Sequence, residues 1–189
     1  MLAAVARLDA LSKGIGRGSA WEGLMALALA DKGWRQAEGI SELYRAFRVT
    51  RILSSPYLRT VQTVRPTAEA LGLAVETRWD LREWTSGIEP TPDYARHFAH
   101  SWEHPDSARP GGESLAAFSD RVRRALTAVA AEHPGGVVLI GTHGTFAGRT
   151  LSATGHSVGW GFLKTMPMPA VHRVQWGGDH PIEATGPGL

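Results

Sequence analysis

Residues 54–63 read SSPYLRTVQT, and residues 137–145 read VVLIGTHGT. The first segment follows a short β-rich run. The second opens with four consecutive apolar residues, three of them β-branched, which is typical of a buried parallel strand. In parallel sheets, ligands bind beyond the carboxyl ends of the strands. We therefore expect the polar residues that follow these runs, Arg59 and His143 among them, to lie at one edge of a sheet.

Strand-like and helix-like segments alternate along most of the chain. Apolar residues at helical spacing predict helices over 31–47, 57–71, 114–132 and 144–153. Short β-rich runs predict strands over 49–53, 73–77, 137–140 and 170–176. Pro66 is expected to kink or restart its helix. The alternation predicts an α/β fold, a three-layer α/β/α sandwich with a mostly parallel sheet.

The chain length fits one domain. With 189 residues we expect a single unit over 1–189. Residues 88–113 contain four prolines and three histidines and show little periodicity. Long excursions of this kind are often functional, so we interpret residues 84–113 as a lid-like segment.

Composition narrows the function classes. The absence of cysteine excludes disulfides, thiolate catalysis and cysteine-type zinc sites. The formal net charge is +2 and the arginines are scattered, so no basic stripe indicates nucleic-acid binding. No apolar run is long enough to span a bilayer and no secretory signal opens the chain, so we expect a cytoplasmic protein without a membrane partner.

The ordered motifs of the chain resemble the histidine phosphatase superfamily, whose fold is phosphoglycerate-mutase-like. DKGWRQA at residues 31–37 resembles the family's L-T-x-x-G-x-x-Q-A, and residues 54–63 resemble S-S-P-x-x-R-x-x-Q-T. Leu81-Arg82-Glu83, Gly112-Glu113-Ser114 and the G-T-H-G of residues 141–144 follow in the family's order. Their order and spacing carry the resemblance, because each motif alone is weak.

The resemblance implies a covalent mechanism and a set of site residues. In the family, a histidine in an R-H-G or R-H-A box attacks phosphorus, and water hydrolyses the phosphohistidine. Arginines and a second histidine hold the phosphoryl oxygens, and an acid protonates the leaving oxygen. Carried over, Arg7, Arg59 and His143 would bind phosphate, while His143 and Glu83 would be catalytic.

The identity of the acid stays open, because Asp80 and Glu89 are alternatives to Glu83. The resemblance implies a phosphorylated or otherwise anionic small molecule as the partner, with no cofactor and no metal. A homodimer is left open.

The N-terminal segment departs from the family pattern. Arg7 aligns with the arginine of the box, and Leu8 then occupies the nucleophile position. Leucine has no atom that can attack phosphorus or donate a hydrogen bond. The first histidine of the chain is His97, so a shift of register recovers none. Residues 1–11 read as the expected strand or, from their alanine and leucine content, as a helix.

Three explanations of this departure remain open. The chain could be a repurposed pseudophosphatase, another group such as Asp9 or Ser12 could replace the nucleophile, or the segment could have been altered. They lead to three functions: a phosphomonoester hydrolase, an inactive phosphate- or partner-binding module, and a non-phosphatase enzyme that reuses the anion pocket.

His97, His100 and His104 are spaced to share one face of a helix. A metal-binding face, polar lid residues that contact substrate, and an ordinary solvated face are the three interpretations. No HExxH motif accompanies these histidines, which argues against the first.

Overall fold

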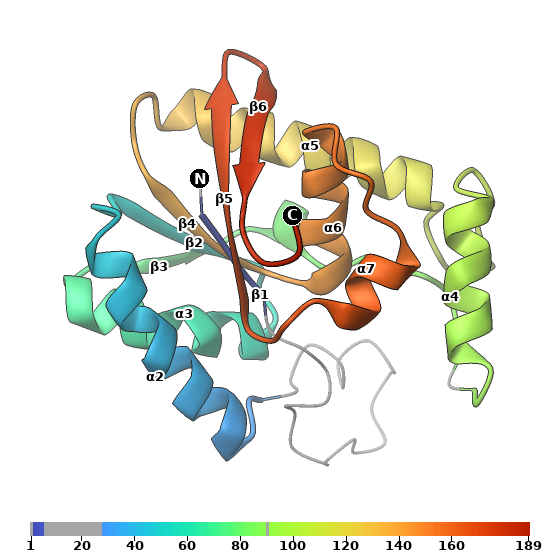
Figure 1. The fold of residues 1–189 in the computed structure, drawn as a ribbon, viewed down its shortest axis with the longest axis horizontal. Coiled ribbons are helices and arrows are strands. Elements are labelled where there is room, and N and C mark those ends of the chain that lie inside the picture. Colours follow the sequence, from blue (N-terminus) through green and yellow to red (C-terminus); the bar gives the residue numbers. More distant parts are fainter. Residues whose placement is uncertain (1, 6–27, 90) are drawn as a thin grey trace.

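The structure is a computed structural model that describes residues 2–5, 28–89 and 91–189. Its described strands form one six-stranded sheet in the order β3-β2-β4-β1-β5-β6 (Figure 1). The first four in that order are parallel, namely β3 (Val75–Thr77), β2 (Arg51–Ser54), β4 (Val138–Thr142) and β1 (Leu2–Val5). The antiparallel strands β5 (Ala170–Gly177) and β6 (His180–Thr185) complete one edge. The sheet is therefore mostly parallel, as the sequence predicts.

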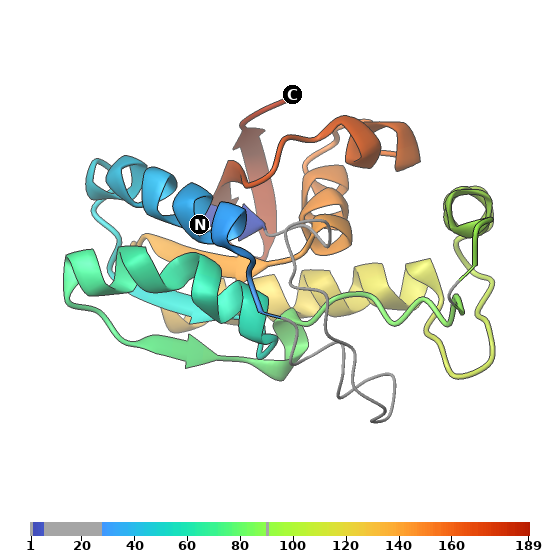
Figure 2. The ribbon, with the colours of Figure 1, turned by 90° about the horizontal axis from the view of Figure 1, so that it is seen from below.

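Helices cover both faces of this sheet (Figures 1 and 2). One face carries α2 (Asp31–Arg45) and α3 (Leu58–Leu71), and the other carries α5 (Leu115–Glu132) and α6 (Gly144–Ala153). Three short elements are added, namely η2 (Trp79–Leu81), α4 (Tyr94–Glu103) and α7 (Trp160–Thr165). The predicted three-layer α/β/α architecture is confirmed.

The central strands alternate between two cores. Ile52 and Leu139 pack with Val64 of α3, whereas Leu53 and Ile140 pack with Phe118 of α5. Successive side chains of a strand point to opposite faces, so a strand covered on both faces is apolar throughout. This explains the continuous apolar run that precedes residue 141.

The structure decides two points that the sequence left open. The expected first strand is present, and the predicted restart of a helix at Pro66 is wrong. Leu2–Val5 forms a strand parallel to β4, so the helical alternative fails for these residues. α3 runs through Pro66 without a break, because Val64 and Thr67 are buried and the packing of α3 on the sheet holds the helix. The remaining predicted helices and strands are present, with ends shifted by one or two residues.

Residues 84–113 leave the sheet and return to it at the start of α5. They include α4, which stands at one side of the molecule (Figure 1). Buried Phe98 anchors it, with its ring 5.3 Å from that of Trp84 and 4.5 Å from that of Trp160. Every helix in the described part of the chain is too short or too polar to cross a bilayer.

Candidate functional site

The strand register brings the predicted site residues to one edge of the sheet. β2 and β4 are neighbours with Ser54 opposite Gly141, so the residues that follow both strands meet. Arg59 lies in the first turn of α3, and His143 is the N-cap of α6. β1 ends level with them, because Val5 pairs with Thr142. Arg7 and Leu8, which come next in the sequence, lie outside the described residues.

Arg59 and His143 are in direct contact. Arg59 Nη2 lies 3.1 Å from His143 Nδ1, and His143 Nε2 lies 2.8 Å from Ser55 Oγ. Arginine has donors only, so Nδ1 must accept and the ring proton of a neutral imidazole resides on Nε2. Nε2 then donates to Ser55, which therefore orients the ring.

An aromatic ring completes the packing of this pair. The ring of Tyr57 lies edge-on to that of His143, with 4.9 Å between centroids. The guanidinium of Arg59 lies over the Tyr57 ring, 4.6 Å from its centroid. Both arginine and histidine are almost fully buried, at 3% and 1% exposure. The geometry of the pair is therefore set by contacts on several sides.

Burial and charge keep His143 neutral. Burial is the main cause that lowers the pKa of His143 well below 6.5, and the positive charges of Arg59 and Arg121 lower it further. Burial also lowers the pKa of Arg59, although an arginine remains charged at any physiological pH. The pair thus offers a buried cation beside an uncharged imidazole.

Glu83 lies at the N-terminus of α6, beside this pair. Its Oε1 accepts from the backbone N–H of Trp84 at 2.8 Å, and its Oε2 from that of Thr145 at 3.5 Å. Burial raises the pKa of Glu83, while the charge of Arg59 and the backbone hydrogen bonds oppose that rise. A carboxyl that keeps its proton to higher pH is suited to protonate a leaving oxygen.

The two alternative acids are placed differently. Asp80 is engaged in a salt bridge with Arg78, with 2.9 Å between Asp80 Oδ2 and Arg78 Nη2. Glu89 is exposed. Of the three carboxylates, Glu83 is the one whose charge raises the pKa of Arg59. The charge of Arg59 in turn lowers the pKa of Glu83.

A partly buried ion pair positions the segment that carries Glu83. Arg121 of α5 donates to both carboxylate oxygens of Glu113. It also donates to the carbonyls of Asp80, Arg82 and Glu83, at 3.0, 3.0 and 3.2 Å. One guanidinium therefore holds the backbone of residues 80–83, up to and including the candidate acid.

Sequence reasoning missed this role of Arg121. The residue lies beside the apolar stripe of its helix, three positions after Phe118, and its guanidinium is 4.6 Å from the Phe118 ring centroid. A charge at the border of an apolar stripe is usually solvated, so spacing alone could not reveal it. Glu113 stands in a quoted motif, but the motif implied no partner for it.

The comparisons with known proteins agree with this architecture. Residues 16–182 match the family model of the histidine phosphatase superfamily (branch 1). The chain belongs to the histidine phosphatase superfamily. A probable phosphoglycerate mutase GpmB of Salmonella typhi is 31% identical over 134 residues, which cover 66% of this chain and 61% of that protein. The match thus spans about three fifths of that relative's length.

Solved histidine-phosphatase-like structures share the fold at lower sequence identity. A mycobacterial glucosyl-3-phosphoglycerate phosphatase has a TM-score of 0.71 and 19% identity, covering 98% of this chain and 95% of that one. A mutant phosphoserine phosphatase from Entamoeba histolytica, in complex with phosphoserine, has a TM-score of 0.74 and 15% identity, covering 99% and 95%. Such likenesses establish the fold of this superfamily member and leave its substrate open.

Proposed function

We propose that this superfamily member binds a phosphorylated small molecule at the edge formed by Arg59, His143 and Glu83. The contact between the buried Arg59 guanidinium and the His143 imidazole carries the proposal. A guanidinium beside a helix N-terminus is a favourable place for a phosphoryl group, because both supply N–H donors and positive charge. Arg7 is proposed as a further phosphate ligand from the motif alone.

The neighbouring proteins support this ligand class. The mycobacterial glucosyl-3-phosphoglycerate phosphatase has been solved with vanadate and with inorganic phosphate. Its likeness to this chain is one of fold, so the ligand class is carried by the site residues. Because Leu8 stands at the nucleophile position, we propose binding without phosphohistidine formation at that residue.

Attack by Ser55 is disfavoured by the tautomer of His143, whereas Asp9 and Ser12 lie outside the described residues. A general base must hold a free lone pair toward the hydroxyl that it activates. In this site the Nδ1 lone pair is directed to Arg59, and Nε2 donates its proton to Ser55. We therefore propose that Ser55 orients the imidazole rather than attacks a substrate.

A thermal-shift titration with orthovanadate and inorganic phosphate tests binding. At 100 times Kd, a ligand stabilises the folded state by about 2.7 kcal/mol. For a domain of this size that raises Tm by roughly 5–10 °C. Arg59→Lys keeps the charge but loses the planar fork, and should weaken binding about 10- to 100-fold.

Arg65→Ala is the matched control. Arg65 lies on the same helix and forms only an exposed ion pair with Glu69, with 3.9 Å between Nε and Oε1. This variant should bind vanadate as the unmodified protein does. Equal loss in Arg59→Lys and Arg65→Ala, or no thermal shift with the unmodified protein, would refute the proposed site.

An aryl phosphate assay separates binding from turnover. The unmodified chain should show no metal-independent hydrolysis, and Leu8→His should introduce it if the rest of the site is competent. His143→Ala in the Leu8→His background should abolish the introduced activity. If the unmodified chain hydrolyses the aryl phosphate and His143→Ala abolishes this activity, the proposal of binding without hydrolysis is wrong, and a nucleophile other than residue 8 is favoured.

A further inference from the structure

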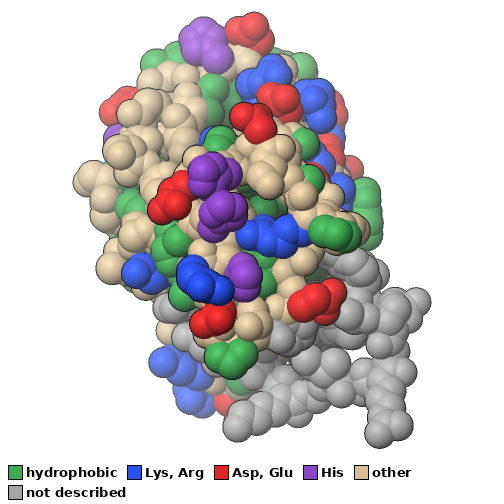
Figure 3. Space-filling model, turned by 90° about the vertical axis from the view of Figure 1, so that its right-hand side faces the viewer, with side chains coloured by type: hydrophobic (Ala, Val, Ile, Leu, Met, Phe, Trp, Pro, Cys, Tyr) green, Lys and Arg blue, Asp and Glu red, His purple; other side chains and the backbone are tan. Residues whose placement is uncertain are grey.

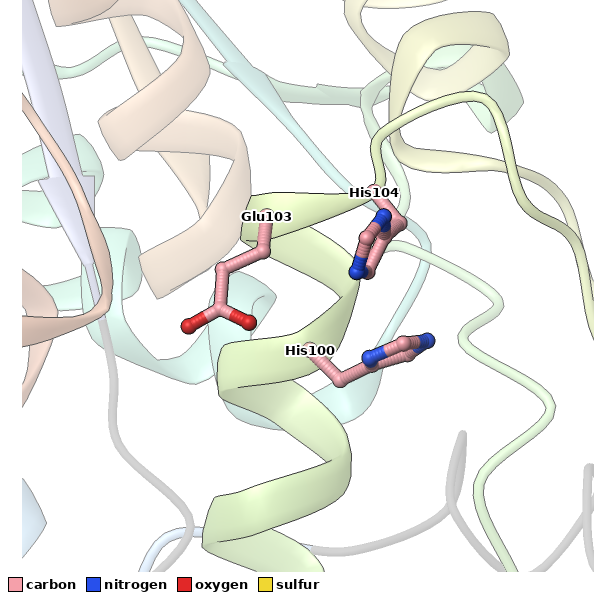
Figure 4. Close-up of side chains that lie close together, drawn as sticks. All are labelled: His100, Glu103 and His104. Carbon is pink, nitrogen blue, oxygen red and sulfur yellow. The ribbon is translucent and has the colours of Figure 1, made fainter.

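The last turn of α4 brings two imidazoles and a carboxylate together on the surface (Figure 4). One ligand atom each of His100, Glu103 and His104 lies within 4.8 Å of the others, and all three residues are exposed. His104 follows the helix as its C-cap, and its N–H donates to the His100 carbonyl at 2.9 Å, so the two histidines stay one turn apart. We propose that these three residues form a binding site for a divalent transition-metal ion of the zinc type.

The donor set selects this class of ion. Two imidazole nitrogens and one carboxylate oxygen suit Zn²⁺, Ni²⁺ or Cu²⁺, whereas Mg²⁺ and Ca²⁺ prefer oxygen ligands alone. Residues 100–104 read HSWEH, the H-x-x-E-H spacing of some zinc enzymes, in which the two histidines bind the ion and the glutamate is a base. Here the three residues lie on an exposed helix face. The proposal is therefore metal binding and not hydrolysis at the metal.

The distances need only a small closure. Bonds of about 2.0–2.1 Å to a tetrahedral ion place its ligand atoms roughly 3.3 Å apart. The present separations of up to 4.8 Å would shrink by up to about 1.5 Å, which rotation of exposed side chains allows. The two imidazole rings already lie next to each other, with 4.3 Å between centroids and 46° between their planes.

Contacts of other residues of α4 hold the helix that carries the site in place. Arg109 donates to Ser101 Oγ at 2.7 Å and to the His97 carbonyl at 2.8 Å, and Phe98 is buried. Binding would therefore order three side chains and not the helix. The C-terminal end of a helix also carries partial negative charge, which favours a cation at this position.

Figure 3 shows histidine side chains gathered near the middle of the face that α4 presents. His97 is one turn before His100 on the same helix, and it contributes no ligand atom to the group of His100, Glu103 and His104. It is a matched control, because it is the same residue type on the same helix. Its carbonyl, which Arg109 binds, is retained in His97→Ala.

Isothermal titration of the untagged full chain with ZnCl₂ tests the site. One Zn²⁺ should bind per chain, and MgCl₂ at the same concentrations should give no binding heat. Loss of a residue that only supports a metal ligand costs about 10- to 100-fold in affinity. His100→Ala and His104→Ala each remove a ligand and should weaken Zn²⁺ binding at least about 10-fold, while His97→Ala should leave it unchanged.

Several results would overturn the proposal. They are the absence of Zn²⁺ binding by the unmodified chain, unchanged affinity in both His100→Ala and His104→Ala, and a loss in His97→Ala as large as theirs. All three variants replace side chains on one helix, so circular dichroism can verify that each remains folded. The site is independent of the phosphate site, and failure of either leaves the other standing.

Discussion

His143 should make the stability of this protein depend on pH near neutrality. The imidazole is buried at 1% exposure between Arg59 and Ser55, and its pKa is held well below 6.5, first by burial and then by the charges of Arg59 and Arg121. When the chain unfolds, the ring reaches water and recovers its ordinary pKa. Below pH 6.5 the imidazole of residue 143 therefore binds a proton in the unfolded state but not in the folded state. Lower pH thus favours unfolding.

The magnitude follows from the distance to the ordinary pKa. At pH 5.5, one pH unit below 6.5, protonation stabilises the unfolded state by about 1.4 kcal/mol, and at pH 7.5 by almost nothing. His172, whose pKa burial also lowers, adds in the same direction. Glu83 acts in the opposite direction, because its folded carboxyl takes up a proton more readily than an unfolded one.

A comparison of two proteins isolates the contribution of His143. Glutamine in its place can accept from Arg59 and donate to Ser55 but does not titrate. Urea unfolding of the unmodified chain and of His143→Gln at pH 5.5 and 7.5 gives four free energies of unfolding. The loss of stability between pH 7.5 and 5.5 should be about 1.4 kcal/mol larger in the unmodified chain. If the two losses coincide, His143 is protonated in the folded state and the argument for a neutral imidazole is wrong.

Four further substitutions test local contributions to stability. A Cβ at Gly141 would lie 2.8 Å from Val64 Cγ1, so Gly141→Ala should destabilise the fold by about 1–3 kcal/mol. A Cβ at Gly39 in α2 would have nothing within 4 Å, so Gly39→Ala should stabilise the fold by about 0.5–1 kcal/mol. Thermal unfolding compares the two variants. Ser114→Ala removes the N-cap oxygen that accepts from the Ala117 N–H, and should lower the unfolding free energy in urea by about 1 kcal/mol. Arg121→Met leaves the Glu113 carboxylate without its partner, and should cost about 3 kcal/mol by the same measurement.

The sheet could be predicted because its central strands carry their own signals. The run at residues 137–140 is apolar on both faces, and the strand it predicts is covered by α3 and α5 together. β6 and α7 carry weaker patterns. β6 is an edge strand with mostly exposed residues, so no alternation of buried and exposed positions marks it in the sequence.

The site could be predicted in part. Arg59 and His143 follow strands whose ends are level, so motif order and the parallel topology suffice to bring them together. Arg121 acts through carbonyl oxygens of residues 80–83, and backbone acceptors carry no sequence signature. The group of His100, Glu103 and His104 on α4 was predicted only in part, for another reason. The spacing predicted that His97, His100 and His104 share one helix face, whereas the structure groups Glu103, and not His97, with His100 and His104.

The proposed ligand and the titration of His143 are physically linked. The charge of Arg59 helps to keep the imidazole neutral, and a phosphate anion beside both groups would oppose that effect. If phosphate binding raises the proton affinity of His143, protonation of His143 must tighten phosphate binding by the protein, because linkage is reciprocal. Saturating phosphate should therefore reduce the acid destabilisation attributable to His143. The same four-point comparison, repeated in phosphate, connects the electrostatics of the buried pair to the function proposed for it.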